Sequence, residues 1–157
     1  MKQILKLIGL IALPLTSFSQ SIPSADKEAV KATIQRFFDA IEKQDSNLFK
    51  STLDPAGQVW VQNQTKDPMQ ISSRFLGQDV GMLTGENQFL EKALHFDIKV
   101  HKGMAMAWVV YEFWRNGKFS HCGIDAFTLM QLDGQWRIMS LAYSVETSGC
   151  DQLKNQH

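Results

Sequence analysis

Three titratable side chains in the second half of the sequence have types and spacing suited to proton transfer: Asp125, His121 and Glu112. His121 and Glu112 flank the pair Asn116-Gly117, a strong signal for a two-residue hairpin turn. Such a turn makes the two side chains cross-strand neighbours. A carboxylate beside an imidazole orients the ring and raises its basicity, so the pair is a candidate general base. The alternative is a solvent-exposed ion pair at the edge of the sheet.

Asp125 stands between apolar neighbours in the same predicted strand. A carboxylate on an apolar face costs free energy unless it is hydrogen-bonded, and burial raises its pKa. Asp125 is therefore a candidate catalytic acid or base. Two other interpretations stay open: it lines a binding pocket, or protein groups satisfy it.

The sequence predicts no metal site and no cofactor. His95, Asp97 and His101 alternate along one predicted strand and therefore share a face, but Lys99 in the same row favours an exposed outer face. Nucleophile-elbow, phosphate-loop, dinucleotide-binding and Cys-x-x-Cys motifs are all missing from the sequence.

Hydrophobic periodicity predicts the elements that must position these residues. Apolar residues recur at helical spacing over residues 24–43, and a short helix is expected over residues 47–53. A strand is expected at 58–62, and short helical pieces between 64 and 91. Period-two alternation predicts four strands at 93–101, 104–114, 118–131 and 135–145. This pattern favours an α+β fold, a curved antiparallel sheet (cone) covered on its concave face by the N-terminal helices.

Two-residue turns at Asn116-Gly117 and Asp133-Gly134 fix the register of the last three strands. That register places large and small side chains together with Asp125 on one face, which leaves room for a mostly apolar pocket. The candidate ligand-binding residues are Trp108, Met106, Phe127, Ser140 and Ala142, with Trp60 as a further aromatic surface for stacking. The opposite face is also apolar, which favours a homodimer.

Residues 1–19 have the features of a cleavable signal peptide. Two lysines precede an apolar run at residues 7–15, which is shorter than the roughly 20 residues that span a bilayer, and Ser17-Phe18-Ser19 is typical of a cleavage site. We therefore expect residues 20–157 to form a single domain that is periplasmic or secreted and leaves the membrane after cleavage. In an oxidising compartment, two cysteines favour a Cys122–Cys150 disulfide; the alternative is two separate thiols.

Composition excludes some classes of protein. Sixteen basic residues balance sixteen acidic residues, so the chain lacks the basic surplus typical of proteins that bind nucleic acid. The hydrophobic fraction of 44% is typical of a folded globular domain.

Several segments resemble the nuclear transport factor 2-like superfamily, which includes ketosteroid isomerase-like and SnoaL-like proteins. They are the first predicted helix, the strand Val59-Trp60-Val61 and the closing run GQWRIMSLAYS. The run YEFWRNGKFSHCGIDAFTLMQLDGQWRI resembles exported bacterial members often labelled putative lumazine-binding. The resemblance covers about Ala25 to Glu146.

This resemblance implies a helix-covered curved sheet with a pocket in the cone, commonly dimeric, but no single activity. In ketosteroid isomerase-like members, carboxylates on the inner face of the sheet do the chemistry, which implies such a role for Asp125. The tyrosine expected on the first helix is missing, since Phe37 and Phe38 stand there. The leading hypothesis is thus an exported module that binds an unidentified small molecule. The alternatives are an isomerase or dehydratase that uses Asp125 or the Glu112–His121 pair, and a dimeric interaction module with a filled pocket.

Overall fold

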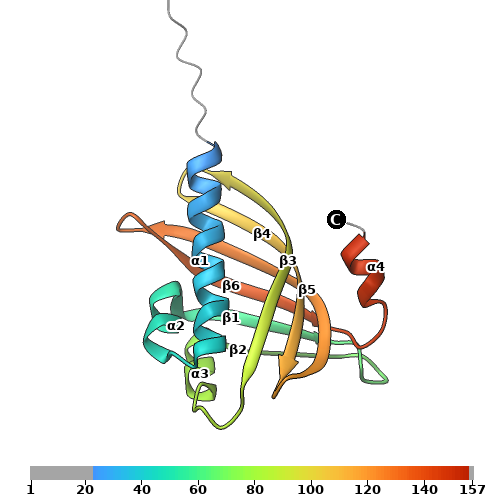
Figure 1. Ribbon diagram of the computed structural model, residues 1–157. Helices are drawn as coiled ribbons and strands as arrows, with labels where there is room; N and C mark the ends of the chain where they lie inside the picture. The colour runs from blue at the N-terminus through green and yellow to red at the C-terminus, as the bar shows by residue number, and fades with distance from the viewer. Residues whose placement is uncertain (1–22, 156–157) are drawn as a thin grey trace, which may run out of the picture.

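The computed structural model describes residues 23–155 (Figure 1). The elements are, in chain order, α1 (Pro23–Lys43), α2 (Ser46–Thr52), β1 (Leu53–Asn63), β2 (Gln70–Phe75), α3 (Leu76–Asp79), the 3-10 helix η1 (Val80–Met82), β3 (Phe89–His101), β4 (Met104–Arg115), β5 (Lys118–Leu132), β6 (Gln135–Val145) and α4 (Cys150–Asn155). The predicted signal peptide lies outside the described residues. None of the helices within residues 23–155 is long and apolar enough to cross a membrane.

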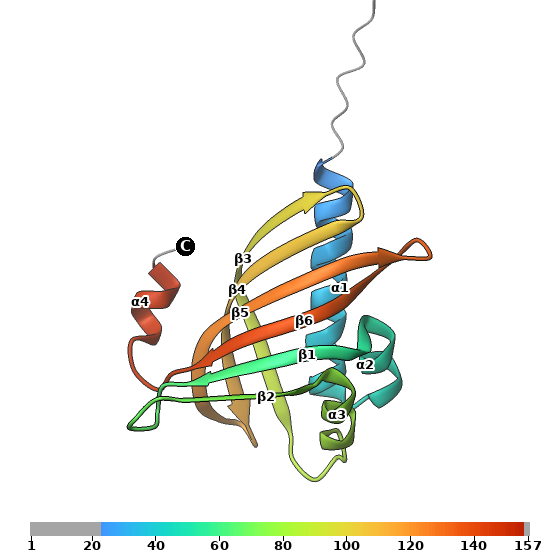
Figure 2. The ribbon, with the colours of Figure 1, turned by 180° about the vertical axis from the view of Figure 1, so that it is seen from behind.

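One six-stranded sheet with the order β2-β1-β6-β5-β4-β3 forms the body of the molecule. β1 runs parallel to β6, and every other neighbouring pair is antiparallel. The sheet curls around α1, which lies on its concave side, and the view from behind shows the convex side in front of the helix (Figure 2). The predicted α+β fold is therefore confirmed.

α1 forms because its apolar residues recur at helical spacing, and it buries that stripe against the sheet. Val30, Ile34 and Phe38 are at most 2% exposed. Phe37 and Phe38 both contact the ring of Phe127 on β5 edge-on, with centroids 5.8 and 6.0 Å apart. Each such phenylalanine contributes roughly 1.5–3 kcal/mol when fully buried, so this cluster holds the helix in the cone.

Both predicted hairpins have two-residue turns, but the register changes a few residues away from each turn. Arg115 pairs with Lys118 at the first turn, whereas Phe113 pairs with His121, so β5 contains one extra residue, Ser120. The β5–β6 ladder shifts in the same way, with Met139 as the extra residue. Each β-bulge moves the following side chains to the other face of the sheet relative to a regular ladder.

The predicted composition of the sheet face was therefore wrong. Asp125 and Phe127 lie on the concave face, where they pair with Val109 and Ala107 of β4. Met106 and Trp108 alternate with those alanine and valine residues and lie on the convex face. On the convex face, Trp108 of β4 is the end of a row of paired residues that crosses four strands. The row consists of Trp60, Ala142, Ala126 and Trp108.

The segment between residues 64 and 91 contains a strand that the sequence did not predict. β2 pairs with β1 at the edge of the sheet, and five of its six side chains are exposed. An edge strand exposed on both faces has no hydrophobic alternation, so its sequence carries no period-two signal. The expected helical pieces are α3 and η1.

The C-terminal helix α4, also not predicted, is attached to the convex side of β5. Cys150 forms a disulfide with Cys122 of β5, and the two Cα atoms are 5.8 Å apart. The ammonium group of Lys154 lies 2.6 Å from a carboxylate oxygen of Glu112. These two links hold α4 over the end of β4 and β5.

Candidate functional site: a carboxyl pair in the cone

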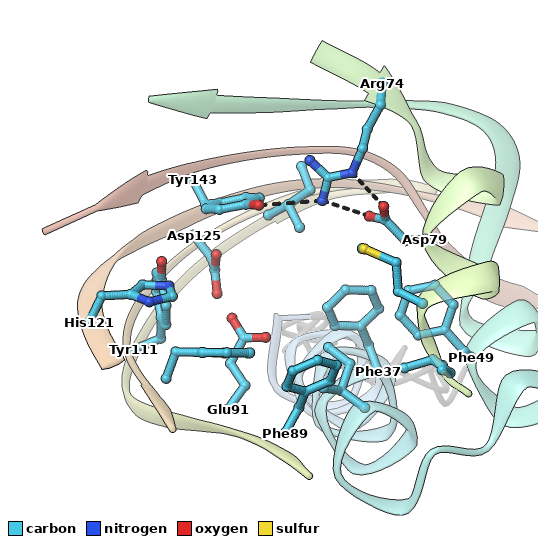
Figure 3. Close-up of a pocket in the computed structure, with 15 residues that line it drawn as sticks. Phe37, Phe49, Arg74, Asp79, Phe89, Glu91, Tyr111, His121, Asp125 and Tyr143 are labelled. Atoms are coloured by element: carbon cyan, nitrogen blue, oxygen red, sulfur yellow. Dashed lines mark hydrogen bonds and ion pairs between the residues drawn. The ribbon is translucent and has the colours of Figure 1, made fainter. Parts of the chain in front are cut away.

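A cavity of about 270 Å³ lies between α1 and the concave face of the sheet. Most of its wall is apolar and comes from both helices and strands, including Phe37, Ile41, Phe49, Phe89, Phe113 and Leu141. Polar side chains converge on it from five strands and α3 (Figure 3). A concave, mostly apolar cavity with a few converging polar groups is the usual form of a small-molecule site.

The carboxyl groups of Glu91 and Asp125 point toward each other in this cavity (Figure 3), and their interaction affects the pKa of both groups. They come from β3 and β5, which are separated by β4. Asp125 is 1% exposed, and within residues 23–155 no protein N–H or O–H donor reaches its Oδ2 atom. Two carboxyl groups can share a hydrogen bond only if one of them carries a proton.

Burial favours the protonated form of both carboxyl groups. It raises the pKa of Glu91 to about 7. Burial also raises the pKa of Asp125 well above its usual value, and the charge on Glu91 and their hydrogen bond raise it further. The pair therefore retains a proton near neutral pH and is able to donate or accept one.

Tyr111 lies beside this pair and donates its hydroxyl hydrogen to the Ser144 carbonyl at 2.6 Å. The two strands approach closely here because Gly123 has no side chain: a Cβ atom at Gly123 would lie 2.1 Å from that carbonyl oxygen. Burial, followed by the charge on Asp125, raises the pKa of Tyr111. Tyr111 therefore stays protonated, and its hydroxyl hydrogen bonds to the Ser144 carbonyl and not to the carboxyl pair.

His121 forms another part of the wall as a neutral ring. It stacks on Phe113 with ring centroids 4.9 Å apart, and its Nδ1 atom lies 3.0 Å from the Ser120 hydroxyl. Burial lowers the pKa of His121. The predicted contact between His121 and Glu112 was wrong, because the bulge at Ser120 pairs Glu112 with Cys122 and turns the Glu112 side chain to the convex side.

Arg74 of β2 and Asp79 of α3 form an ion pair at the other side of the cavity (Figure 3). The Nη2 atom of Arg74 donates to Asp79 Oδ2 at 2.9 Å and to the Tyr143 hydroxyl at 3.3 Å. The positive charge of Arg74 is therefore already neutralised by the protein. Burial raises the pKa of Tyr143, so its hydroxyl is protonated as well.

Of the candidate site residues predicted from the sequence, Asp125 and His121 line this cavity. Phe127 is buried in the core against α1. The remaining ligand-binding candidates are on the convex face, where Trp60, Trp108 and Ala142 line one shallow depression and Met106 lines another, with Ser140 half-buried beside them. The roles of all these residues in binding or catalysis stay predictions.

Glu91, Arg74, Asp79 and Tyr143 were missed. Glu91 lies two residues before the predicted start of its strand, where period-two alternation continued back from His95 and Asp97 would put it on the convex face. The register of β3 shifts between Ala93 and His95, and this shift places Glu91 on the concave face. Arg74 and Asp79 belong to the segment without periodicity and carried no such signal. Within residues 23–155, no three His, Cys, Asp or Glu side chains are grouped closely enough to hold a metal ion.

A curved, mostly antiparallel sheet wrapped around a long helix, with polar groups inside the cone, is the architecture of nuclear transport factor 2-like (NTF2-like) proteins. An NTF2-like superfamily protein from Salmonella enterica has a TM-score of 0.62 and 20% identity, with 80% of this chain and 94% of that chain covered. A putative dehydratase of the same family from Streptomyces avermitilis has a TM-score of 0.63 and 16% identity, with coverages of 80% and 99%. At these identities, the similarity shows the fold alone.

The family follows from the sequence itself. Residues 25–144 match the model of the family described as "Putative lumazine-binding", and the chain belongs to that family. No curated protein matches the chain. The β subunit of a putative aromatic-ring-hydroxylating dioxygenase from Novosphingobium aromaticivorans also shares the fold, with a TM-score of 0.64, 11% identity and coverages of 78% and 90%. Proteins that share this fold thus differ in function, so the fold alone does not define the function of this chain.

Proposed function

We propose that this protein is an exported module that binds one small, largely apolar molecule in the cavity between α1 and the concave face. The observation that carries this proposal is the Asp125 Oδ2 atom, which is buried at an apolar cavity and has no hydrogen-bond donor among residues 23–155. Leaving such an acceptor unsatisfied costs about 1–3 kcal/mol, and a donor on a ligand would remove that cost.

Export is supported by the signal-peptide features of residues 1–19 and by the Cys122–Cys150 disulfide, since disulfides persist in oxidising compartments. We infer a periplasmic or secreted mature chain that begins at Gln20. Its mass in a periplasmic or culture fraction tests this inference. An uncleaved chain in the cytoplasmic fraction would contradict it.

Native mass spectrometry on residues 20–157, purified from a periplasm without reducing agent, tests the binding function. We expect a discrete additional mass on the protein. The variant Ile41→Trp should lack this mass, because Ile41 lines the cavity and the larger ring fills it. The matched control is Met69→Trp, at an exposed position outside the cavity. A bare wild-type protein would count against stable ligand binding and leave two alternatives, an enzyme and an interaction module with a filled cone.

A second candidate function is proton transfer in the manner of an isomerase or dehydratase. The paired carboxyl groups of Glu91 and Asp125 favour it, because a buried pair that exchanges one proton near neutral pH is suited to general acid–base chemistry. Once a ligand is identified, incubation with the protein tests whether it is converted. If the protein is an enzyme, Asp125→Asn should keep binding the ligand but lose turnover. If the wild type leaves the ligand unchanged, the protein is a binder.

We also infer that two copies associate through the convex face of the sheet. The row from Trp60 to Trp108 crosses four strands, and its two tryptophans are 46% and 47% exposed. Ile71 and Met106, 64% and 62% exposed, extend the apolar surface on either side. An exposed apolar face of this kind on a small domain is typical of a protein interface.

A further inference from the structure

We propose that the ligand of this cavity is a compact apolar or aromatic amine, whose ammonium group binds between Glu91 and Asp125. This inference rests on the proposed binding function and names the chemical class that the cavity selects. It follows from the charges, the unpartnered acceptor and the aromatic rings of the cavity.

The charge balance of the cavity favours a cation. Glu91 and Asp125 bring two carboxyl groups into it. Arg74, the cation on its wall, is bound to Asp79 and Tyr143 (Figure 3). His121 is neutral because burial lowers its pKa. A carboxylate or phosphate ligand would therefore meet like charges without a free cation on the cavity wall to offset them.

The carboxyl pair also needs more donors than the protein supplies. Tyr111 is close to the pair, but its hydroxyl hydrogen is committed to the Ser144 carbonyl. The shared proton of Glu91 and Asp125 satisfies one contact between them and leaves the other oxygens as acceptors. An ammonium group has three N–H donors and can bridge both carboxyl groups, whereas an alcohol has one.

Aromatic rings complete the surroundings that a buried ammonium group requires. Tyr111, Phe89 and Tyr143 line the cavity around the carboxyl pair (Figure 3). Phe113 is a further aromatic residue of the cavity wall. A cation over an aromatic face gains about 0.5–2 kcal/mol when it is removed from water. The same rings accommodate an apolar body, so one end of the cavity suits the charge and the rest suits the carbon skeleton.

Binding of an amine should release a proton. The positive charge stabilises the ionised form of the carboxyl pair and drives out the proton that the pair holds near neutral pH. The other titratable groups that face the cavity are Tyr111, Tyr143 and His121, with the Arg74–Asp79 ion pair. The two tyrosines are already protonated and His121 is already neutral, so the released proton comes from the carboxyl pair.

Isothermal titration of the disulfide-bonded mature protein at pH 7 with three probes tests this inference. 3-Phenylpropylamine, 3-phenylpropan-1-ol and 3-phenylpropionate share one apolar body and differ in the charge of the head group. We expect the amine to bind at least about 10-fold more tightly than the alcohol, and the carboxylate to bind more weakly than either. Titrations in two buffers of different ionisation enthalpy should show release of about one proton per amine bound.

The variants Asp125→Asn and Glu91→Gln keep the shape of the site and remove one carboxyl group each. Either variant should reduce the preference for amine over alcohol to within about 3-fold. The control Asp39→Asn removes a carboxylate that pairs with Lys43 on α1, and it should retain the preference. Thermal unfolding establishes that each variant is folded, and having two variants allows for the loss of one.

The outcomes separate this inference from the proposed function. If the alcohol binds as tightly as the amine, or no proton is released, the inference is wrong and the binding function stands. If none of the three probes binds to folded protein, both the ligand class and the proposed function are contradicted.

Discussion

Asp125 and Glu91 make the stability of the native protein depend on pH. Their native pKa values lie above their ordinary values of 3.8 and 4.5, so the folded chain binds more protons than the unfolded chain above about pH 4. By linkage, their contribution to the free energy of unfolding is complete below about pH 4 and is lost as the pH rises through the native pKa values, which begin near 7. The buried pair is thus a destabilising feature at alkaline pH, as expected of a site kept for function.

The variant Asp125→Asn tests this at the level of one residue. The amide of the variant can donate to the Glu91 carboxylate, and it carries no charge between pH 6 and pH 9. The free energy of unfolding of the variant relative to wild type should increase by about 1–2 kcal/mol between pH 6 and pH 9. Urea unfolding across this range measures the difference. Asp39→Asn serves as the control, and wild-type and Asp125→Asn curves that stay parallel would contradict the prediction.

At the level of elements, β-bulges decide which side chains reach the cavity. They lie at Ser120 and Met139, and a third register shift between Ala93 and His95 brings Glu91 to the concave face. The turns at Asn116-Gly117 and Asp133-Gly134 were predicted correctly because their chemistry is local: Asn116 and Asp133 take positive φ angles, followed by glycines that also do. Nothing local marks Ser120 or Met139 as an extra residue. Packing of β5 and β6 against α1 and the curvature of the sheet select those positions.

Deletion of Ser120 should be tolerated, since it leaves a regular ladder in which Phe113 still pairs with His121 and Trp114 with Phe119. We expect a loss of about 1 kcal/mol, from the local twist and the lost Ser120–His121 contact. Deletion of Ala126 is the matched comparison. It makes Asp125 and Phe127 adjacent, so both cannot stay on the concave face, and the protein should not fold. Circular dichroism and thermal unfolding compare the two. Equal damage from both deletions would refute this account of the bulge.

The disulfide that attaches α4 is a second feature at this scale. Cys122 and Cys150 are 28 residues apart, and closing such a loop stabilises the folded chain by about 3–4 kcal/mol through the entropy of the unfolded chain. Cys150→Ser should therefore lower the free energy of unfolding by that amount. The measurement is urea unfolding without reductant. Addition of dithiothreitol should reproduce the loss in wild type and leave Cys150→Ser unchanged, whereas a change in the variant would point to another cause.

At the scale of the whole molecule, the exposed convex face predicts a dimer. Trp108→Glu places a charge in the middle of this face and should convert the dimer to a monomer at micromolar concentration, without loss of secondary structure. Light scattering after size-exclusion chromatography measures the mass. Leu132→Glu, at an exposed position close to the Asp133-Gly134 turn, is the control and should stay dimeric. A monomeric wild-type protein would refute the dimer.

The sequence by itself determined the features that depend on neighbouring residues: the apolar stripe of α1, the two tight turns, the approximate limits of four strands, and Asp125 as a carboxylate in an apolar strand. Tertiary structure decided the rest of the site. Glu91 and Asp125 face each other across the intervening strand β4. The extra residue Ser120 in β5 pairs Asp125 with Val109, so Trp108 lies on the opposite face from Asp125. Because side chains alternate between the two faces of a strand, one extra residue moves every later side chain to the opposite face. The faces of the sheet therefore depend on bulges that only the packing of the complete cone selects.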